Sequence, residues 1–234
     1  MTSIDLSEFL SFSRALVRRD RRSASEGSRR ALNVVVAGVG LAITAPVMVF
    51  VAVLVKLTSP GPVLYRQLRV GLDRRSPVRP EGNSRRSVNH GGRPFTIYKF
   101  RTMRVEQGDA QVWARPDDPR VTPIGRVLRK YRLDELPQLW NVLRGDMNVV
   151  GPRPEQPEIF ATLREQIDGY PGRQRVRPGI TGWAQVNQHY DSCLDDVRRK
   201  VALDLEYVGR QSLTEDLRIM LKTAPVMIFQ RGAW

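Results

Sequence analysis

Residues 31–55 read ALNVVVAGVGLAITAPVMVFVAVLV, a run of 25 residues without a charged side chain. Arg29 and Arg30 precede the run, and Lys56 follows it. A helix needs about 20 apolar residues to cross the hydrocarbon core of a bilayer, so the run is long enough to do so. The cores of soluble proteins seldom contain an apolar run of this length. The sequence therefore predicts a membrane helix rather than a buried helix of a soluble protein.

The path of this helix is indicated by a proline and by the charges around it. Pro46 lies near the middle, where a proline removes a backbone hydrogen bond and bends a helix. Basic residues flank both ends: Arg14, Arg18, Arg19, Arg21, Arg22, Arg29 and Arg30 before it, and Lys56, Arg66, Arg69, Arg74 and Arg75 after it. Positive charge favours the cytoplasmic side, so we expect both ends there. A helix that dips into one leaflet and returns fits both features, and a plain span with a kink at Pro46 is the alternative.

The composition narrows the function classes. Among 234 residues there are 38 Lys and Arg against 24 Asp and Glu, a net charge of +14. Such an excess attracts phosphate groups, whether in nucleic acid, anionic lipid or a phosphorylated substrate. A nucleic-acid-binding protein has no use for the apolar run, so we expect no nucleic acid partner. Cys193 is the only cysteine, which excludes an internal disulfide and favours a reducing compartment. The first thirty residues lack an apolar core, so no cleavable signal peptide is expected.

The rest of the chain predicts a small hairpin and several helices. Residues 63–67 and 95–100 read as two strands, with a loop rich in Pro, Gly, Ser and Arg at 72–94 between them. Thr122 is a plausible N-cap for a helix that continues to about Tyr131. A second helix is predicted to follow Asp134 and to stop just before Gly145, and others are predicted at 155–168, 191–210 and 213–229. The last one either lies on a membrane interface or packs in the core.

The densest chemical signal is Arg132–Gln138, which reads RLDELPQ. Asp134 falls at the predicted N-cap, where free N–H groups and the helix dipole favour a phosphate group. An aspartate can attack phosphorus and form a covalent intermediate, and Glu135 suits a divalent cation such as Mg²⁺. Nearby basic residues can balance a diphosphate: Arg126, Arg129, Lys130 and Arg132. The alternative is that Asp134 only caps the helix and Glu135 only pairs with an arginine.

Five segments in order carry a resemblance to a known family: TSPGPVLYR at 58–66, KFRTM at 99–103, RLDELPQLWN at 132–141, GPRP at 151–154 and PGITGWAQVN at 178–187. The chain resembles, over about residues 29–234, the bacterial sugar transferases known as monotopic phosphoglycosyl transferases. The resemblance implies transfer of a phosphosugar from a UDP-sugar to a polyprenyl phosphate such as undecaprenyl phosphate, with release of UMP, as the first step of exopolysaccharide, O-antigen or glycan assembly. A catalytically inactive membrane scaffold of a polysaccharide assembly complex is the alternative.

The resemblance also implies an architecture. The expected fold is α+β and mostly helical: a monotopic membrane protein with a re-entrant N-terminal helix, a small β-hairpin and interfacial amphipathic helices. It divides the chain into a basic polar tail at 1–28, a re-entrant membrane helix at 29–57, and a catalytic domain at 58–234 with a loop insertion at 72–94. The implied location is the bacterial inner membrane, with the catalytic domain on the cytoplasmic face. Membrane lipid is then a partner, and the sequence leaves a homo-oligomer open.

The family's functional residues are carried over position by position. Asp134 becomes the nucleophile that forms the phosphosugar–enzyme intermediate, and Glu135 works with Mg²⁺. Lys99, Arg101 and Arg153 lie among the substrate-proximal residues. The sequence departs from the family at the membrane bend, where Ala45 replaces a frequent serine and Thr44 can supply the hydroxyl. Asn33 stands where the family commonly has an aspartate.

Overall fold

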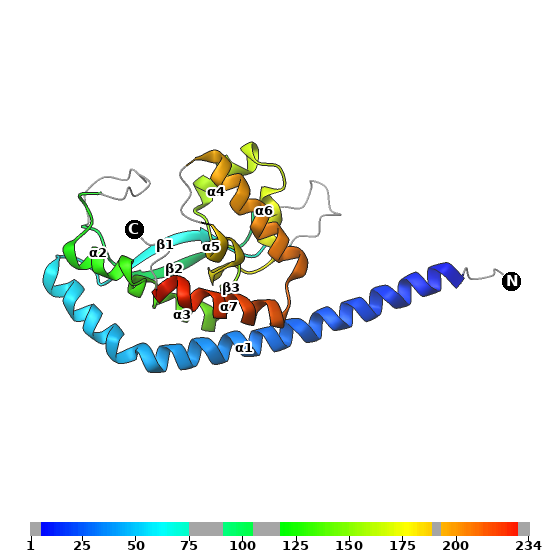
Figure 1. Ribbon diagram of the computed structural model, residues 1–234, viewed down its shortest axis with the longest axis horizontal. Coiled ribbons are helices and arrows are strands. Elements are labelled where there is room, and N and C mark those ends of the chain that lie inside the picture. Colours follow the sequence, from blue (N-terminus) through cyan, green and yellow to red (C-terminus); the bar gives the residue numbers. More distant parts are fainter. Residues whose placement is uncertain (1–5, 75–90, 105–117, 189–192, 229–234) are drawn as a thin grey trace.

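The computed structural model describes residues 6–74, 91–104, 118–188 and 193–228, with side chains between 26 and 225. The described part is mostly helical and contains two small two-stranded sheets (Figure 1). Its elements follow in the order α1 (Leu6–Thr58), β1 (Leu64–Val70), β2 (Pro94–Phe100), α2 (Pro123–Lys130), η1 (Leu133–Glu135), α3 (Gln138–Arg144), β3 (Asn148–Val150), α4 (Pro157–Gln166), η2 (Tyr170–Arg175), β4 (Gly179–Thr181), α5 (Trp183–Asn187), α6 (Leu194–Arg210) and α7 (Leu213–Ile228), where η1 and η2 are 3-10 helices. The expected mostly helical α+β fold is confirmed at this level.

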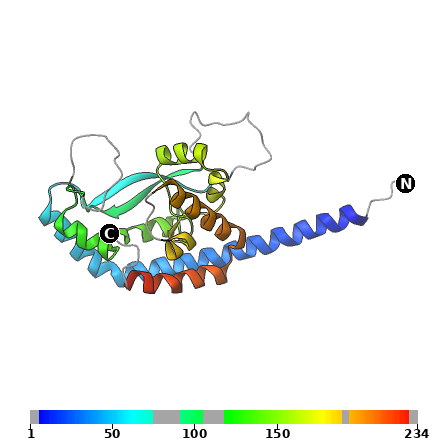
Figure 2. The same ribbon diagram turned by 45° about the horizontal axis from the view of Figure 1, so that its top comes forward.

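The long helix α1 runs beneath the folded domain and extends well beyond it on the N-terminal side (Figures 1 and 2). It is helical across residue 28, where the sequence suggested a boundary between a tail and a membrane helix. It also continues through Pro46 without a break, and Figure 1 shows that the helix bends under the domain. Thr44 Oγ1 donates to Gly40 O at 2.7 Å, a back-bond that helps a helix bend and keeps its hydroxyl satisfied.

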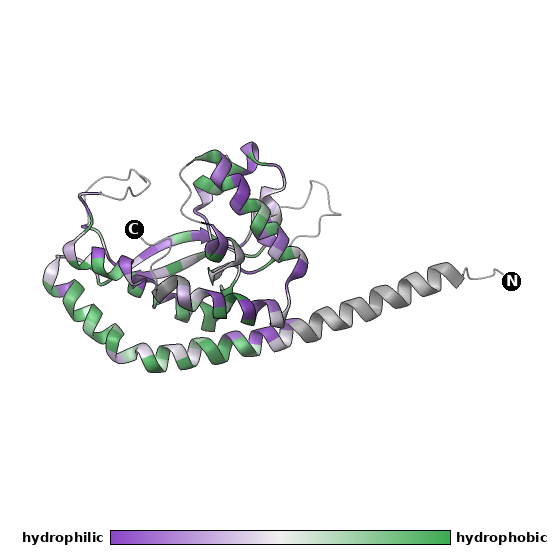
Figure 3. Cartoon of the chain, viewed as in Figure 1, coloured by the Kyte–Doolittle hydropathy of each residue, from purple (hydrophilic) through white to green (hydrophobic). Residues whose placement is uncertain are grey.

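Most of the apolar surface of α1 is uncovered. The segment Glu26–Thr58 is long and apolar enough to cross a membrane, judged by length and composition, and only 11% of its most apolar window is buried. Large side chains stand out from it, among them Ile43 at 71% and Phe50 at 63% exposure. Figure 3 shows hydrophobic residues along the part of α1 that lies under the domain. A core helix of a soluble protein would be mostly buried, so this exposure favours the membrane interpretation.

The predicted hairpin is present. Strands β1 and β2 pair antiparallel, with Leu64 opposite Phe100 and Val70 opposite Pro94. Strand β2 packs on α1, because Ile97 shares a core cluster with Ala37, and Phe100 shares another with Val51 and Val55. The predicted loop insertion at 72–94 lies for the most part outside the described residues. At its base, Arg93 N donates to Leu72 O at 3.0 Å and extends the pairing of the hairpin.

The predicted cap residues lie at the start of α2 and at the end of α3. Thr122 caps α2, since Gly125 N donates to its Oγ1 at 2.9 Å. Gly145 ends α3 in the left-handed region at φ 84°, which glycine adopts at little cost. Asn141 on α3 donates from Nδ2 to Thr96 O at 2.7 Å, and its Oδ1 accepts from Tyr98 N at 3.2 Å. Asn141 therefore fixes α3 against β2.

The C-terminal part of the chain, from α4 to α7, completes the domain. The predicted helices at 155–168, 191–210 and 213–229 correspond to α4, α6 and α7. The sequence did not indicate the parallel pair β3–β4, in which Asn148 lies opposite Gly179 and Val150 opposite Thr181. Helix α7 lies beside α1 in both views (Figures 1 and 2). One face of α7 packs in the core and another is exposed, because Ile219 is fully buried while Leu221 is 76% exposed.

Candidate active site

The adjacent carboxylates Asp134 and Glu135 lie in the 3-10 turn η1, between α2 and α3. The prediction that Asp134 caps the following helix is wrong: α3 begins at Gln138, and Pro137 is its cap residue. Pro137 has no N–H and a fixed φ, so it fits at the start of the helix, and the residues before it tighten into i to i+3 hydrogen bonds. Leu136 N donates to Leu133 O at 3.3 Å. A helix terminus therefore does not explain the site.

The turn is entered through Arg132, the one non-glycine residue with positive φ in the described part of the chain, at φ 53°. Its carbonyl oxygen accepts from Glu135 N at 3.1 Å. The left-handed conformation reverses the chain after α2 and directs the two carboxylates into the domain, where both are buried. Arg132 belongs to the predicted basic surroundings, and its charge contributes to lowering the pKa of Glu135.

Glu135 is held by two cations. Lys99 Nζ donates to its Oε1 at 2.9 Å, and Arg153 Nη2 donates to the same oxygen at 2.5 Å. Arg153 Nη1 reaches Oε2 at 3.4 Å. Burial alone would raise the pKa of Glu135, but the charges of Arg153 and Lys99 outweigh it and hold this pKa well below its ordinary value. Glu135 is thus an ionised, doubly paired carboxylate.

Asp134 differs from Glu135 in its partners and in the direction of its pKa shift. It is 8% exposed, and its carboxylate makes no hydrogen bond or ion pair with another residue in the part of the chain that the structure describes. Burial, and then the negative charge of Glu135, raise its pKa to about 6. Lys99, Arg153 and Arg129 act in the other direction and keep the pKa from rising further. A carboxylate with free lone pairs beside fixed positive charges can act as a nucleophile toward an anionic substrate.

The structure brings Lys99, Glu135 and Arg153 together with Asp134, as expected for substrate-proximal residues. Arg101 is placed differently. Its Nη2 donates to Ser59 O and Oγ at 2.8 Å, and Nη1 donates to Pro60 O at 2.7 Å. These bonds hold the end of α1 against β2. A contact of Arg101 with substrate therefore stays a prediction, and its observed bonds give it a structural role.

A second layer that the sequence did not reveal supports Arg153. Arg173 is 1% exposed and donates from Nη2 to Arg153 O at 3.1 Å. It is itself fixed by Asp204 Oδ2 at 2.7 Å and by the hydroxyl of Tyr170 at 2.9 Å. Next to it, Glu155 pairs with Lys200 at 3.0 Å. Arg173 lies in a basic stretch that looks solvent-exposed in the sequence, so no sequence signal pointed to this role.

The site suits a divalent cation only in part. The parts of the chain that the structure describes contain no group of three or more His, Cys, Asp or Glu side chains that could hold a metal ion. Magnesium usually takes one or two protein carboxylates and completes its shell with water and substrate phosphate oxygens, so the adjacent pair is a suitable donor set. Glu135 Oε2, with one contact at 3.4 Å, is the less engaged oxygen of that residue.

Comparisons with known proteins find a matching family and several related proteins. The family described as bacterial sugar transferase matches residues 24–230. The chain is 42% identical over 207 residues to the UDP-N-acetylgalactosamine-undecaprenyl-phosphate N-acetylgalactosaminephosphotransferase of Aeromonas hydrophila, which covers 88% of this chain and 44% of that protein. It is 40% identical over 198 residues to the UDP-glucose:undecaprenyl-phosphate glucose-1-phosphate transferase of Escherichia coli, covering 83% of this chain and 39% of that protein.

A third relative is closer to this chain in length. The protein of Caulobacter vibrioides that is also named UDP-glucose:undecaprenyl-phosphate glucose-1-phosphate transferase is 39% identical over 216 residues, covering 91% of this chain and 74% of that protein. The chain spans less than half the length of the first two relatives. The shared part includes the segment with Asp134 and Glu135.

Proposed function

The chain belongs to the bacterial sugar transferase family, and from this premise we propose that it transfers a sugar phosphate from a UDP-sugar to undecaprenyl phosphate. The named relatives use either glucose or N-acetylgalactosamine, so the proposed donor is a UDP-linked hexose or N-acetylhexosamine. The observation that carries the proposal is the asymmetry of the two carboxylates. Asp134 has a raised pKa and no ion-pair partner among the described residues, whereas Glu135 is ionised and paired with two cations.

The chemistry proposed for Asp134 is covalent. One carboxylate oxygen of Asp134 attacks the β-phosphorus of the donor, an O–P bond forms, and the bond to the UMP oxygen breaks, so UMP leaves with that electron pair. A phosphate oxygen of the polyprenyl acceptor then attacks the same phosphorus and releases Asp134 as a carboxylate. Each step exchanges one oxygen–phosphorus bond for another. The site therefore needs no oxidant and no reductant.

The cations around Glu135 support such a transfer. Lys99 and Arg153 are fixed on separate elements, β2 and the turn after β3, and both face the carboxylate pair. Fixed positive charges stabilise the charge on the phosphate oxygens in the transition state without reorganising. Mg²⁺, when bound, would supply further neutralisation of the diphosphate, with Glu135 as its protein ligand. The charges of Lys99 and Arg153 also limit the rise in the pKa of Asp134 that burial and Glu135 cause.

The membrane placement is proposed from α1. Its apolar, exposed segment has basic residues on both sides, and it bends through Pro46 within a continuous helix. We propose that it enters and leaves the inner membrane on the cytoplasmic face, with the domain resting on that face. Exposed apolar side chains also occur on α3 and α7, two helices that contact α1: Trp140, Leu217 and Leu221. The soluble donor and the lipid acceptor would then reach one site at the interface.

Release of UMP tests the proposal. Purified chain in detergent, given undecaprenyl phosphate and a panel of UDP-sugars, should release UMP with at least one of them. Asp134→Asn should lower the rate by more than about a thousandfold, since the amide is no nucleophile. Asp195→Asn is the control, because Asp195 lies exposed on α6 and its one ion pair among the described residues is with Arg198 at 2.8 Å. Equal rates in the two variants would remove Asp134 from the chemistry, and no UMP with any sugar would favour an inactive scaffold.

A further inference from the structure

A basic pocket lies where α1 passes the end of α3. Four arginines line it together with Glu26 and with Asn148 of β3: Arg29, Arg30, Arg175 and Arg177. The carboxylate pair adjoins the start of α3, whereas this pocket adjoins its end. Helix α3 has seven residues, a length of about 10 Å, so the pocket is separate from the candidate active site.

The arginines of this pocket differ in how far their charge is balanced. Arg29 is neutralised by Asp216, with Nε to Oδ2 at 2.7 Å. Arg30 donates to Val142 O and Leu143 O, both at 2.6 Å, and Arg177 donates from Nε to Gly145 O at 3.1 Å. Carbonyl oxygens carry only partial charge, so these two arginines keep a net positive charge. They also cap the end of α3, which is their ordinary structural explanation.

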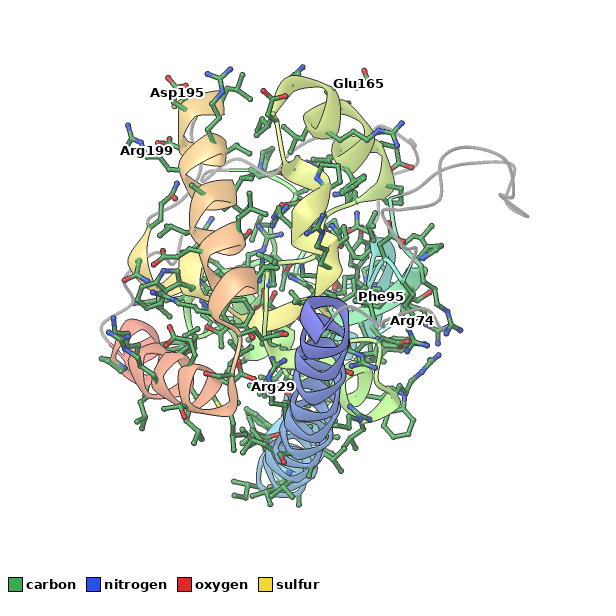
Figure 4. All side chains as sticks on the ribbon, turned by 90° about the vertical axis from the view of Figure 1, so that its right-hand side faces the viewer. Arg29, Arg74, Phe95, Glu165, Asp195 and Arg199 are labelled. Atoms are coloured by element: carbon green, nitrogen blue, oxygen red, sulfur yellow. The ribbon has the colours of Figure 1, made fainter. Side chains whose placement is uncertain are left out.

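Two further arginines have no such explanation. Arg175 is exposed and has no hydrogen bond or ion pair with another described residue. Arg74 is brought next to it, because Asp73 N donates to Gln174 O at 2.7 Å. Figure 4 shows Arg29 beside α1 and Arg74 on the same half of the domain in this view, with Arg199 away from both on α6. Among the described residues that line the pocket, Glu26 is the one acid, against Arg29, Arg30, Arg175 and Arg177. Arg74 is not part of the lining, but its charge acts on Arg177.

The pKa of Arg177 shows that the arginines around the pocket repel one another. Burial lowers the pKa of its guanidinium, and the charges of Arg74 and Arg30 lower it further. Glu26 opposes this effect, and Arg29 adds to it. An anion with several oxygens would relieve this repulsion and could accept from the terminal nitrogens of Arg177 and from Arg175.

We propose that this pocket binds the phosphate group of an anionic lipid head group. The lipid source follows from position, and it rests on the membrane placement proposed above. Arg29 and Arg30 come directly before Ala31, the first residue of the uncharged run, so the pocket lies at the depth where head groups meet the apolar helix. Bound lipid would fix the height of α1, and with it the active site, relative to the membrane surface.

The test uses the full chain in non-ionic detergent and a short-chain phosphatidylglycerol, followed by titration calorimetry. We expect saturable binding of about one lipid per chain. The double variant Arg74→Gln, Arg175→Gln should weaken the binding of the lipid by about tenfold or more, because each arginine contributes a few-fold to the affinity. Arg198→Gln with Arg199→Gln removes the same charge from α6 and should change it less than about twofold. Neither Arg74 nor Arg175 makes a hydrogen bond through its side chain in the described residues, so the double variant should fold.

Each result decides the matter. Binding without saturation, or equal loss in the two double variants, would show general attraction of a basic surface and overturn the site. Inorganic phosphate that binds as tightly as phosphatidylglycerol would overturn the lipid as its source. Neutral phosphatidylcholine vesicles separate the two proposals: a chain that binds them but lacks the saturable anionic site contradicts only this inference. A chain that does not bind them contradicts the membrane placement.

Discussion

At the scale of single residues, two adjacent carboxylates have opposite surroundings. Glu135 faces Lys99 and Arg153, while Asp134 is buried without a hydrogen-bonding partner among the described residues. Both belong to the 3-10 turn η1 and both are buried, yet these two neighbours in sequence have different partners. Glu135 then serves as the fixed negative charge that gathers cations. Asp134 remains available to a phosphorus atom.

This asymmetry predicts a pH dependence. The pKa of Asp134 is raised to about 6, mainly by burial, so this carboxyl is protonated at a higher pH than an ordinary aspartate. Its reactive form is ionised, so kcat/KM for the donor should fall as the pH drops through about 6.

Glu135→Gln is the variant that assigns this fall to Asp134. It removes a negative neighbour and leaves Lys99 and Arg153 uncompensated, so both effects lower the pKa of Asp134. The acid limb of the remaining activity should move to lower pH, while it stays in place in Asp195→Asn. A limb that does not move in Glu135→Gln, or a flat profile down to about pH 5, would contradict the assignment.

At the scale of elements, α1 is locked to the domain by a buried network. Arg29 donates to Asp216 on α7 at 2.7 Å and to the hydroxyl of Tyr207 on α6 at 3.0 Å. Tyr207 in turn donates to Asp216 at 2.7 Å. Asn33, one turn further along, accepts from Val149 N through its Oδ1. The departure from the family's usual aspartate at residue 33 thus places an amide that satisfies two backbone groups, since it also donates to Arg29 O at 2.6 Å.

Breaking this network should destabilise the protein. Asp216→Asn leaves the charge of Arg29 buried without its counter-ion, and we expect the free energy of unfolding to fall by about 3 kcal/mol. Denaturant unfolding in a fixed detergent measures this change. Asp195→Asn, on the exposed side of α6, should change it by less than about 0.5 kcal/mol. If the two variants are equally stable, the buried pair does not hold α1 to the domain.

The sequence predicted those elements whose signals are local. Thr122 begins α2 and Gly145 ends α3 as expected, because capping depends on a few neighbouring residues. The helix start at Asp134 was wrong, since Pro137 imposes the start three residues later. The parallel pair β3–β4 could not be foreseen, because each strand has three residues and the partners are about thirty residues apart. Arg173 shows the same limit within the site, because its burial depends on residues distant in the sequence.

At the scale of the whole molecule, one long helix connects the membrane proposal to the catalytic one. The sequence predicted the apolar segment and the bend at Pro46, because length, charge and proline are visible in it. It did not predict that α1 is continuous from Leu6 to Thr58. Apart from the one bond that Pro46 cannot donate, a continuous helix satisfies its own backbone groups, as a segment inside a membrane must.

Labelling of cysteines tests how α1 sits in the membrane. In a Cys193→Ser background, which removes the one native and exposed thiol, single cysteines replace Gly27 and Tyr65, one on each side of the apolar segment. A side chain at Gly27 meets no atom within 4 Å, and Tyr65 is 46% exposed, so both positions tolerate a cysteine. An impermeant maleimide should label neither in whole cells and both after permeabilisation. Labelling of one position from outside would indicate a plain span.

The central claim is that Asp134 carries the sugar phosphate between donor and acceptor. The most direct measurement is the mass of the protein after incubation with its UDP-sugar in the absence of polyprenyl phosphate. We expect a gain of one sugar phosphate per chain, located on the peptide that contains Asp134, with about one equivalent of UMP released. The adduct should be lost on adding undecaprenyl phosphate and absent from Asp134→Asn. Release of UMP only when the acceptor is present, with no adduct on that peptide, would contradict the account and favour direct transfer in a ternary complex.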